Sequence, residues 1–181
     1  MICFCKTSNI LSIEWLEQSA KVQKVLDTDD FLLLSDKEAE KTYNFSLSDS
    51  LRNGALVREE RGGVLGGWNL YICSGVAGNR APPAKELKLI VEAAGATFLR
   101  SVSGKSALDP AKTIIITSDP ANDKQLKEAR KVTTMGARTH TTTWLFQVMI
   151  TQSLVEEGKC SKKRKMVSPP SSGKRKSTRR K

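Results

Sequence analysis

Residues 113–117, with the sequence Thr-Ile-Ile-Ile-Thr, constrain the fold of this chain more than any other feature. β-branched residues favour extended structure, and three consecutive isoleucines leave no polar face for water. A strand of this kind must be covered on both faces, which is typical of a parallel sheet between layers of helices. The sequence therefore indicates an α/β domain.

Residues 68–154 surround that strand with an alternation of short extended runs and amphipathic helices. Between Pro83 and Gly95, for example, Leu87, Ile90 and Ala94 recur at helical spacing, and Gly95 is placed to end the helix. The expected order is a strand at 68–73, a helix at 83–95, strands at 96–99 and 113–117, a helix at 123–131, a strand at 137–140 and a last helix that carries residues 144–152. We therefore predict a small four-stranded parallel sheet flanked by helices.

The N-terminal part lacks this alternation. It predicts one amphipathic helix around residues 13–19, almost no strand, and a linker helix from residue 37 to about residue 52. Residues 12–18 nevertheless resemble residues 141–147, because in both segments polar residues precede a Trp-Leu pair in the first turn of a helix. We interpret the two segments as the ends of two copies of one repeat, and we expect Trp15 and Trp144 to be structural core residues.

The positive charge is confined to one end of the chain. The sequence holds 30 Lys and Arg against 19 Asp and Glu, a net charge of +11. Eleven basic residues and no acidic one lie in residues 159–181, so residues 1–158 carry nineteen of each sign. That tail contains only Met166 and Val167 as large apolar residues, too few to offset its ordering entropy, and we predict that residues 157–181 are disordered.

The tail has two basic clusters, which consist of Lys162, Lys163, Arg164 and Lys165 and of Lys174, Arg175 and Lys176. Their spacing resembles a bipartite nuclear import signal, which predicts importin as a partner and the nucleus as the location. The same charges would add non-specific attraction to nucleic acid.

Several classes of function find no support in the residues. Four scattered cysteines fit neither a disulfide scaffold nor a zinc site, and no nucleophile motif accompanies the single histidine, His140. No apolar stretch approaches the length of a membrane span. We predict no catalytic residues, no metal, no cofactor and no membrane partner, and a structural or exposed His140.

The sequence resembles the BRCT family, in which each repeat ends with a strand, a polar turn and a helix bearing a core Trp. The resemblance covers about residues 9–155. It rests on the order of elements, Ser74-Gly75 after the first strand, Ala93-Ala94-Gly95-Ala96, Lys127, Trp144 and a linker-like segment at 38–51. It implies a remnant of a first repeat at 1–26, a linker with a helix at 27–63, a complete second repeat at 64–156 and the tail at 157–181, so that the first repeat is truncated.

The resemblance also implies a function. BRCT repeats are non-catalytic modules that bind partner proteins, often phosphorylated ones, in nuclear DNA-damage response. Phosphate needs a short hydroxyl, a free backbone amide and a cation in one notch. By resemblance Ser74, Gly75 and Lys127 are the phosphate-binding candidates, and Ile90 is the candidate for a peptide groove.

The sequence leaves other interpretations open. Ser74-Gly75 could be only a turn that ends a strand, and Lys127 only a solvated charge. The chain could also be a nucleic-acid-binding protein that acts through its tail. A small flavodoxin-like enzyme would fit the α/β alternation alone, without the glycine loop that holds a cofactor phosphate.

Overall fold

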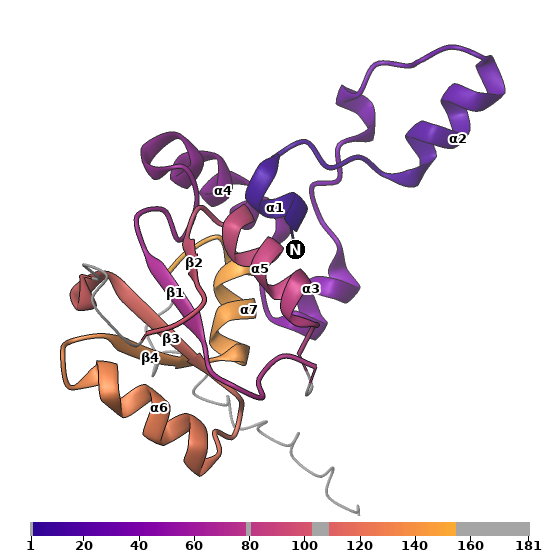
Figure 1. Cartoon of the computed structure of the whole chain (residues 1–181). Coiled ribbons are helices and arrows are strands. Elements are labelled where there is room, and N and C mark those ends of the chain that lie inside the picture. The colour runs from indigo at the N-terminus through magenta and orange to yellow at the C-terminus, as the bar shows by residue number, and fades with distance from the viewer. Residues whose placement is uncertain (1, 79–80, 103–108, 155–181) are drawn as a thin grey trace, which may run out of the picture.

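The structure is a computed structural model that describes residues 2–78, 81–102 and 109–154 (Figure 1). The predicted disordered segment at 157–181, with its basic clusters at 162–165 and 174–176, lies outside the described residues. A four-stranded parallel sheet stands at the centre, in the order β2-β1-β3-β4. Its strands are β1 (Asn69–Ile72), β2 (Thr97–Leu99), β3 (Thr113–Thr117) and β4 (Arg138–Thr141). The predicted fold class is confirmed.

The strand β3 lies between β1 and β4 and is buried at all five positions. It pairs in register with both neighbours, so that Ile114 lies beside Leu70 and Ile116 beside His140. The run of isoleucines is therefore covered on both faces, as the sequence indicates.

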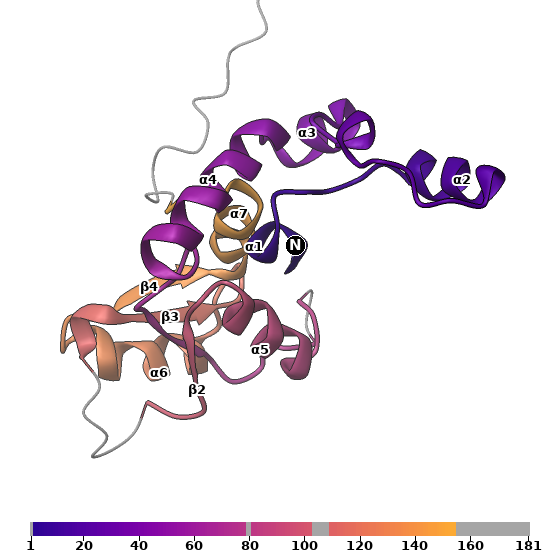
Figure 2. The same cartoon turned by 90° about the horizontal axis from the view of Figure 1, so that it is seen from above.

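Helices cover the two faces of the sheet (Figures 1 and 2). One face carries α5 (Ala84–Ala93) and α7 (Thr142–Thr151), whose apolar side chains share a core with Leu70, Ile114 and Ile116. The other face carries α6 (Asp123–Thr133), which packs on Tyr71, Cys73 and Ile115. Short 3-10 turns occur at Asp29–Phe31 and Pro110–Lys112.

The first residues form a helix that the sequence did not predict. The helix α1 (Ile2–Lys6) packs against α4 (Leu47–Arg61), α5 and α7. Its Cys5 is 2% exposed and lies in the same core as Val148 and Met149. Five residues are too few to be helical alone, so α1 depends on its contacts with α4, α5 and α7.

The linker contains two helices where the sequence predicts one. The helix α3 (Lys37–Tyr43) ends at Asn44, whose φ of 51° is left-handed, and α4 begins after Ser46, whose hydroxyl accepts a hydrogen bond from the Asp49 amide. Asparagine tolerates left-handed geometry and serine is a favoured N-cap, so a helix end and a helix start stand two residues apart. The sequence contained both signals, and the prediction of one helix was wrong.

The helix α2 (Ile13–Val22) forms where it is predicted, but it projects away from the sheet (Figure 1). None of its residues is buried. Trp15 is half-buried, lies outside both core clusters, and donates a hydrogen bond from Nε1 to the Leu26 carbonyl at 3.0 Å. Trp15 therefore does not occupy the expected core position, because none of the four described strands lies beneath α2.

Candidate functional site

The structure brings Ser74 and Lys127 to one hollow. Ser74 lies two residues after the end of β1, following Cys73, while Lys127 lies in the middle of α6. The hollow has a volume of about 560 Å³ and is lined by Ser74, Asp123, Lys124, Lys127, Glu128 and Lys131. Gly75 lies beside it with a φ of 78°, a left-handed conformation that favours glycine and turns the chain away after Ser74.

A fully buried glutamine fixes Ser74 against α6. Gln125 donates from Nε2 to the Ser74 carbonyl at 3.2 Å, and its Oε1 accepts from the backbone amides of Ser118 and Asn122 at 3.2 and 3.3 Å. Asn122 in turn caps α6 by accepting from the Gln125 amide at 2.9 Å. The first turn of α6 and the end of β1 are thus held together by one side chain.

Three hydrogen-bond donors converge on the carboxylate of Glu128. The Ser74 amide donates to Oε2 at 3.1 Å and the Ser74 hydroxyl to Oε1 at 3.3 Å. The Tyr71 hydroxyl also donates to Oε1. The donors at the candidate phosphate position are therefore engaged by an anion that belongs to the chain itself.

The protonation states at this site follow from the geometry. Burial raises the pKa of Glu128. The hydrogen bonds from Tyr71 and Ser74 and the charge of Lys124 lower this pKa by more than burial raises it, so the net shift is downward. Burial and the hydrogen bond to Glu128 raise the pKa of Tyr71 to about 12. At neutral pH Glu128 is a carboxylate and Tyr71 keeps the proton that it donates.

Three lysines line the same hollow as this carboxylate without pairing to it at salt-bridge distance. Lys124, Lys127 and Lys131 line the hollow, and all three are exposed. Within residues 2–78, 81–102 and 109–154, the salt bridges join Arg52 to Asp49 and Lys88 to Glu92. The hollow therefore combines cationic side chains with one internal anion.

Sequence reasoning missed Glu128 and Tyr71. The spacing of Lys124, Glu128 and Lys131 places them on one face of α6. No feature of the sequence says that this face meets Ser74, because that depends on how α6 packs against β1.

The structure buries Ile90, the candidate for a peptide groove. It is 6% exposed and belongs to the core shared by α5 and α7, where Cys5 of α1 joins the same cluster. Its role in a peptide groove stays a prediction, which this burial does not favour.

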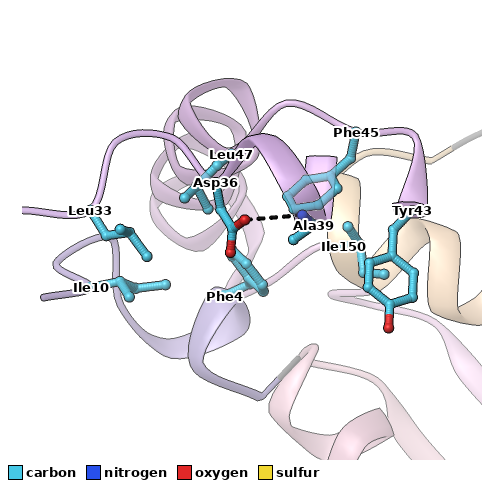
Figure 3. A pocket seen from close by; sticks show the side chains of 9 residues that line it. All are labelled: Phe4, Ile10, Leu33, Asp36, Ala39, Tyr43, Phe45, Leu47 and Ile150. Atoms are coloured by element: carbon cyan, nitrogen blue, oxygen red, sulfur yellow. Dashed lines mark hydrogen bonds between the residues drawn. The ribbon is translucent and has the colours of Figure 1, made fainter. Parts of the chain in front are cut away.

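An apolar cavity of about 400 Å³ lies instead between the linker, α1 and α7 (Figure 3). It is lined by Phe4, Ile10, Leu33, Asp36, Ala39, Tyr43, Phe45, Leu47 and Ile150. Phe4 and Phe45 meet edge to face with ring centroids 6.2 Å apart. Asp36 accepts the Ala39 amide at 3.0 Å, which caps α3.

Trp144 and His140 are the two remaining residues for which the sequence makes a prediction, and they contact each other. Trp144 lies in the sheet core at 7% exposure, and the His140 ring stacks on it with centroids 3.9 Å apart. Among the described residues no group of three His, Cys, Asp or Glu side chains is placed to hold a metal ion. In the same part of the chain, no helix has the length and apolar character of a membrane span.

Comparison with known proteins relates this architecture to others. The chain is 37% identical over 93 residues to the human mediator of DNA damage checkpoint protein 1, a match covering 51% of this chain and 4% of the relative. It is 29% identical over 153 residues to the bovine PAX-interacting protein 1, covering 81% of this chain and 14% of the relative. The chain thus spans a small fraction of the relatives it matches. No family model matches it.

A solved structure has the same fold. The BRCT5-BRCT6 domains of Brc1 from S. pombe superpose with a TM-score of 0.61 at 16% identity, covering 83% of this chain and 72% of that one. The chain has the BRCT fold, and its relatives in sequence support its place in the BRCT-domain family.

Proposed function

We propose that this chain is a non-catalytic adaptor of nuclear DNA-damage response or chromatin regulation that binds a phosphorylated partner protein. Its relatives in sequence support the interaction role. We place the phosphate in the hollow at Ser74, with Gly75 shaping the turn and Lys127 supplying positive charge. We also propose the division of the chain into a repeat remnant at 1–26, a linker at 27–63, a repeat at 64–156 and a tail at 157–181.

One observation carries the phosphate assignment. A backbone amide, a serine hydroxyl and a tyrosine hydroxyl converge on one anion, and three lysines line the same hollow. A phosphate monoester has close to two charges and three acceptor oxygens, so it requires this combination of donors and cations.

The test compares immobilised degenerate peptide libraries that contain either phosphoserine or serine at the fixed position. The full chain should be retained more strongly by the phosphorylated library, and the difference should disappear in S74A and in K127A. Arg130→Ala is the matched control, because it removes an exposed cation of α6 that does not line the hollow. Equal retention on both libraries at every loading would refute phosphate reading.

A second candidate function is nucleic-acid binding through the tail, which the charge distribution favours. All of the net positive charge resides in residues 159–181. If this function holds, deletion of 159–181 abolishes binding to a DNA duplex, and the intact chain loses affinity steeply with added salt. Binding that survives the deletion would assign DNA contact to the neutral part of the chain and reject this candidate.

Nuclear placement is tested with the same tail. Replacing Lys162, Lys163, Arg164 and Lys165 by alanine in a fluorescent fusion should shift the protein to the cytoplasm and weaken importin binding. A nuclear distribution unchanged by this replacement, and by replacement of Lys174, Arg175 and Lys176, would contradict the import role.

A further inference from the structure

The position of Glu128 is unusual for a site that is to receive phosphate. The Ser74 amide and hydroxyl are the two donors that a phosphate would use, and both donate to this carboxylate. The Tyr71 hydroxyl donates to it as well. An incoming phosphate would meet a like charge and donors that are already engaged.

We infer that Glu128 is a built-in competitor for the anion site, so that phosphate binds at Ser74 only when the Glu128 side chain swings out. This inference rests on the proposed phosphate-binding function and adds its regulation. A carboxylate that holds the donors also keeps the end of β1 attached to α6 while the site is without ligand.

The surroundings of Glu128 allow such a movement. Its side chain is only partly buried, and the hollow in front of it is open to solvent on the lysine-bearing face of α6. Lys124 lies four residues before it and Lys131 three residues after it, the two spacings at which helix side chains meet. A displaced Glu128 can therefore pair with either lysine while the backbone of α6 stays in place.

The same geometry defines which ligand can displace it. A ligand carboxylate offers the donors nothing that Glu128 does not already offer. A phosphate monoester carries more charge and more acceptor oxygens, so it gains additionally from Lys124, Lys127 and Lys131. The internal competitor thus predicts a site that accepts phosphoserine and rejects aspartate or glutamate in the same peptide.

The experiment titrates the full chain with the probe acetyl-phosphoserine-amide and follows the backbone amide signals of Ser74 and Gly75 by NMR. We expect E128A to bind at least about tenfold tighter than the unsubstituted chain, and E128Q to gain less because its amide still fills the notch. A factor of ten corresponds to about 1.4 kcal/mol. Acetyl-aspartate-amide should bind E128A detectably and the unsubstituted chain not at all.

Asp123→Asn is the matched control. Asp123 lines the same hollow on the same helix, so its replacement removes an equal charge without freeing the donors held by Glu128. We expect its gain to stay below about twofold, because the effect depends on vacating the notch and not only on net charge. The double variant E128A/S74A should lose the gain, and circular dichroism of each variant checks that the fold is kept.

The outcomes separate this inference from the proposed function. Equal affinity of the unsubstituted chain, E128Q and E128A, with binding lost in S74A, would overturn the competitor and leave phosphate reading intact. A gain in D123N as large as that in E128Q would also overturn it, as a general charge effect. If no variant binds the probe, the phosphate site and its competitor are both rejected.

Discussion

The helices α2 and α7 begin with similar residues, but α7 is packed in the core and α2 is not. Both place a Trp-Leu pair in their first turn, Trp15-Leu16 in α2 and Trp144-Leu145 in α7. In α7 the side chains of Trp144 and Leu145 are buried, whereas α2 buries none of its residues. Leu145 is fully buried and Leu16 is 57% exposed.

The difference comes from what lies beneath each helix. The helix α7 packs against β3 and β4, and the Thr141 hydroxyl caps it by accepting the Trp144 amide at 3.2 Å. The helix α2 has no sheet beneath it among the described residues, and the Ser12 side chain makes no capping hydrogen bond. Helical periodicity is therefore a local property, whereas burial belongs to the assembly of elements.

The largest effect that this comparison predicts is on stability. Trp144→Ala removes a large side chain from the sheet core and should cost about 3–5 kcal/mol of unfolding free energy. Trp15→Ala should cost less than about 1 kcal/mol, because this side chain lies outside both cores. Urea denaturation followed by far-UV circular dichroism measures both, and equal costs would show that α2 is as well packed as α7.

Hydrogen exchange should reveal the same contrast in the unsubstituted chain. Amides of α7 should exchange with protection close to that of global unfolding, since five of its residues are buried. Amides of α2 should exchange by local opening at a small fraction of that free energy. Mass spectrometry of peptides from the two helices tests this, and strong protection of α2 would contradict its isolation from the core.

Cysteine reactivity should show whether α1 belongs to the packed core with α7 or to the loosely packed region with α2. Cys3 is exposed, whereas Cys5, two residues later, is buried against Met149 and Gln152. Burial raises the pKa of the Cys5 thiol, and it raises the pKa of Cys73 to about 12. At mildly alkaline pH, site-resolved mass spectrometry should find Cys3 alkylated by iodoacetamide well before Cys5 and Cys73. Rapid alkylation of Cys5 would assign α1 to the loosely packed region of α2 and not to the core.

The smallest effect concerns the contact between β1 and α6. Because the pKa of Tyr71 is raised in the folded chain to about 12, its stabilising contribution is present below pH 10 and is lost as the pH rises from 10 towards 12. Glu128→Gln removes the charge that opposes ionisation, so the pKa of Tyr71 should fall towards its ordinary value. Tyrosinate absorbance in a Tyr43→Phe background isolates this residue, and an unchanged titration would show that burial alone sets the pKa.

Much of the fold follows from local patterns in the sequence. The β-branched run of β3 and the helical spacing around Leu87 are sufficient to predict the sheet and its helices. The helix α1 could not be predicted, because a segment of five residues is helical only through its contacts with α4, α5 and α7. The same contact explains why Ile90, which has the spacing of a helix face, is covered.

The candidate site could also be predicted from the sequence only in part. Resemblance to a family names Ser74, Gly75 and Lys127, and the structure brings Ser74 and Lys127 to one hollow with Gly75 beside it. Glu128 escaped prediction because a glutamate on a charged helix normally faces solvent, and its hydrogen bonds with Ser74 cross 54 residues of sequence.

The sequence by itself therefore determined the order of strands and helices in residues 68–154 and the concentration of positive charge in residues 159–181. Both depend on the periodicity and composition of neighbouring residues. Only the tertiary structure decided which tryptophan is buried and which anion lies at Ser74. Those outcomes depend on surfaces that are brought together from distant parts of the chain, since β1 meets α6 and α7 meets the sheet only in the folded protein.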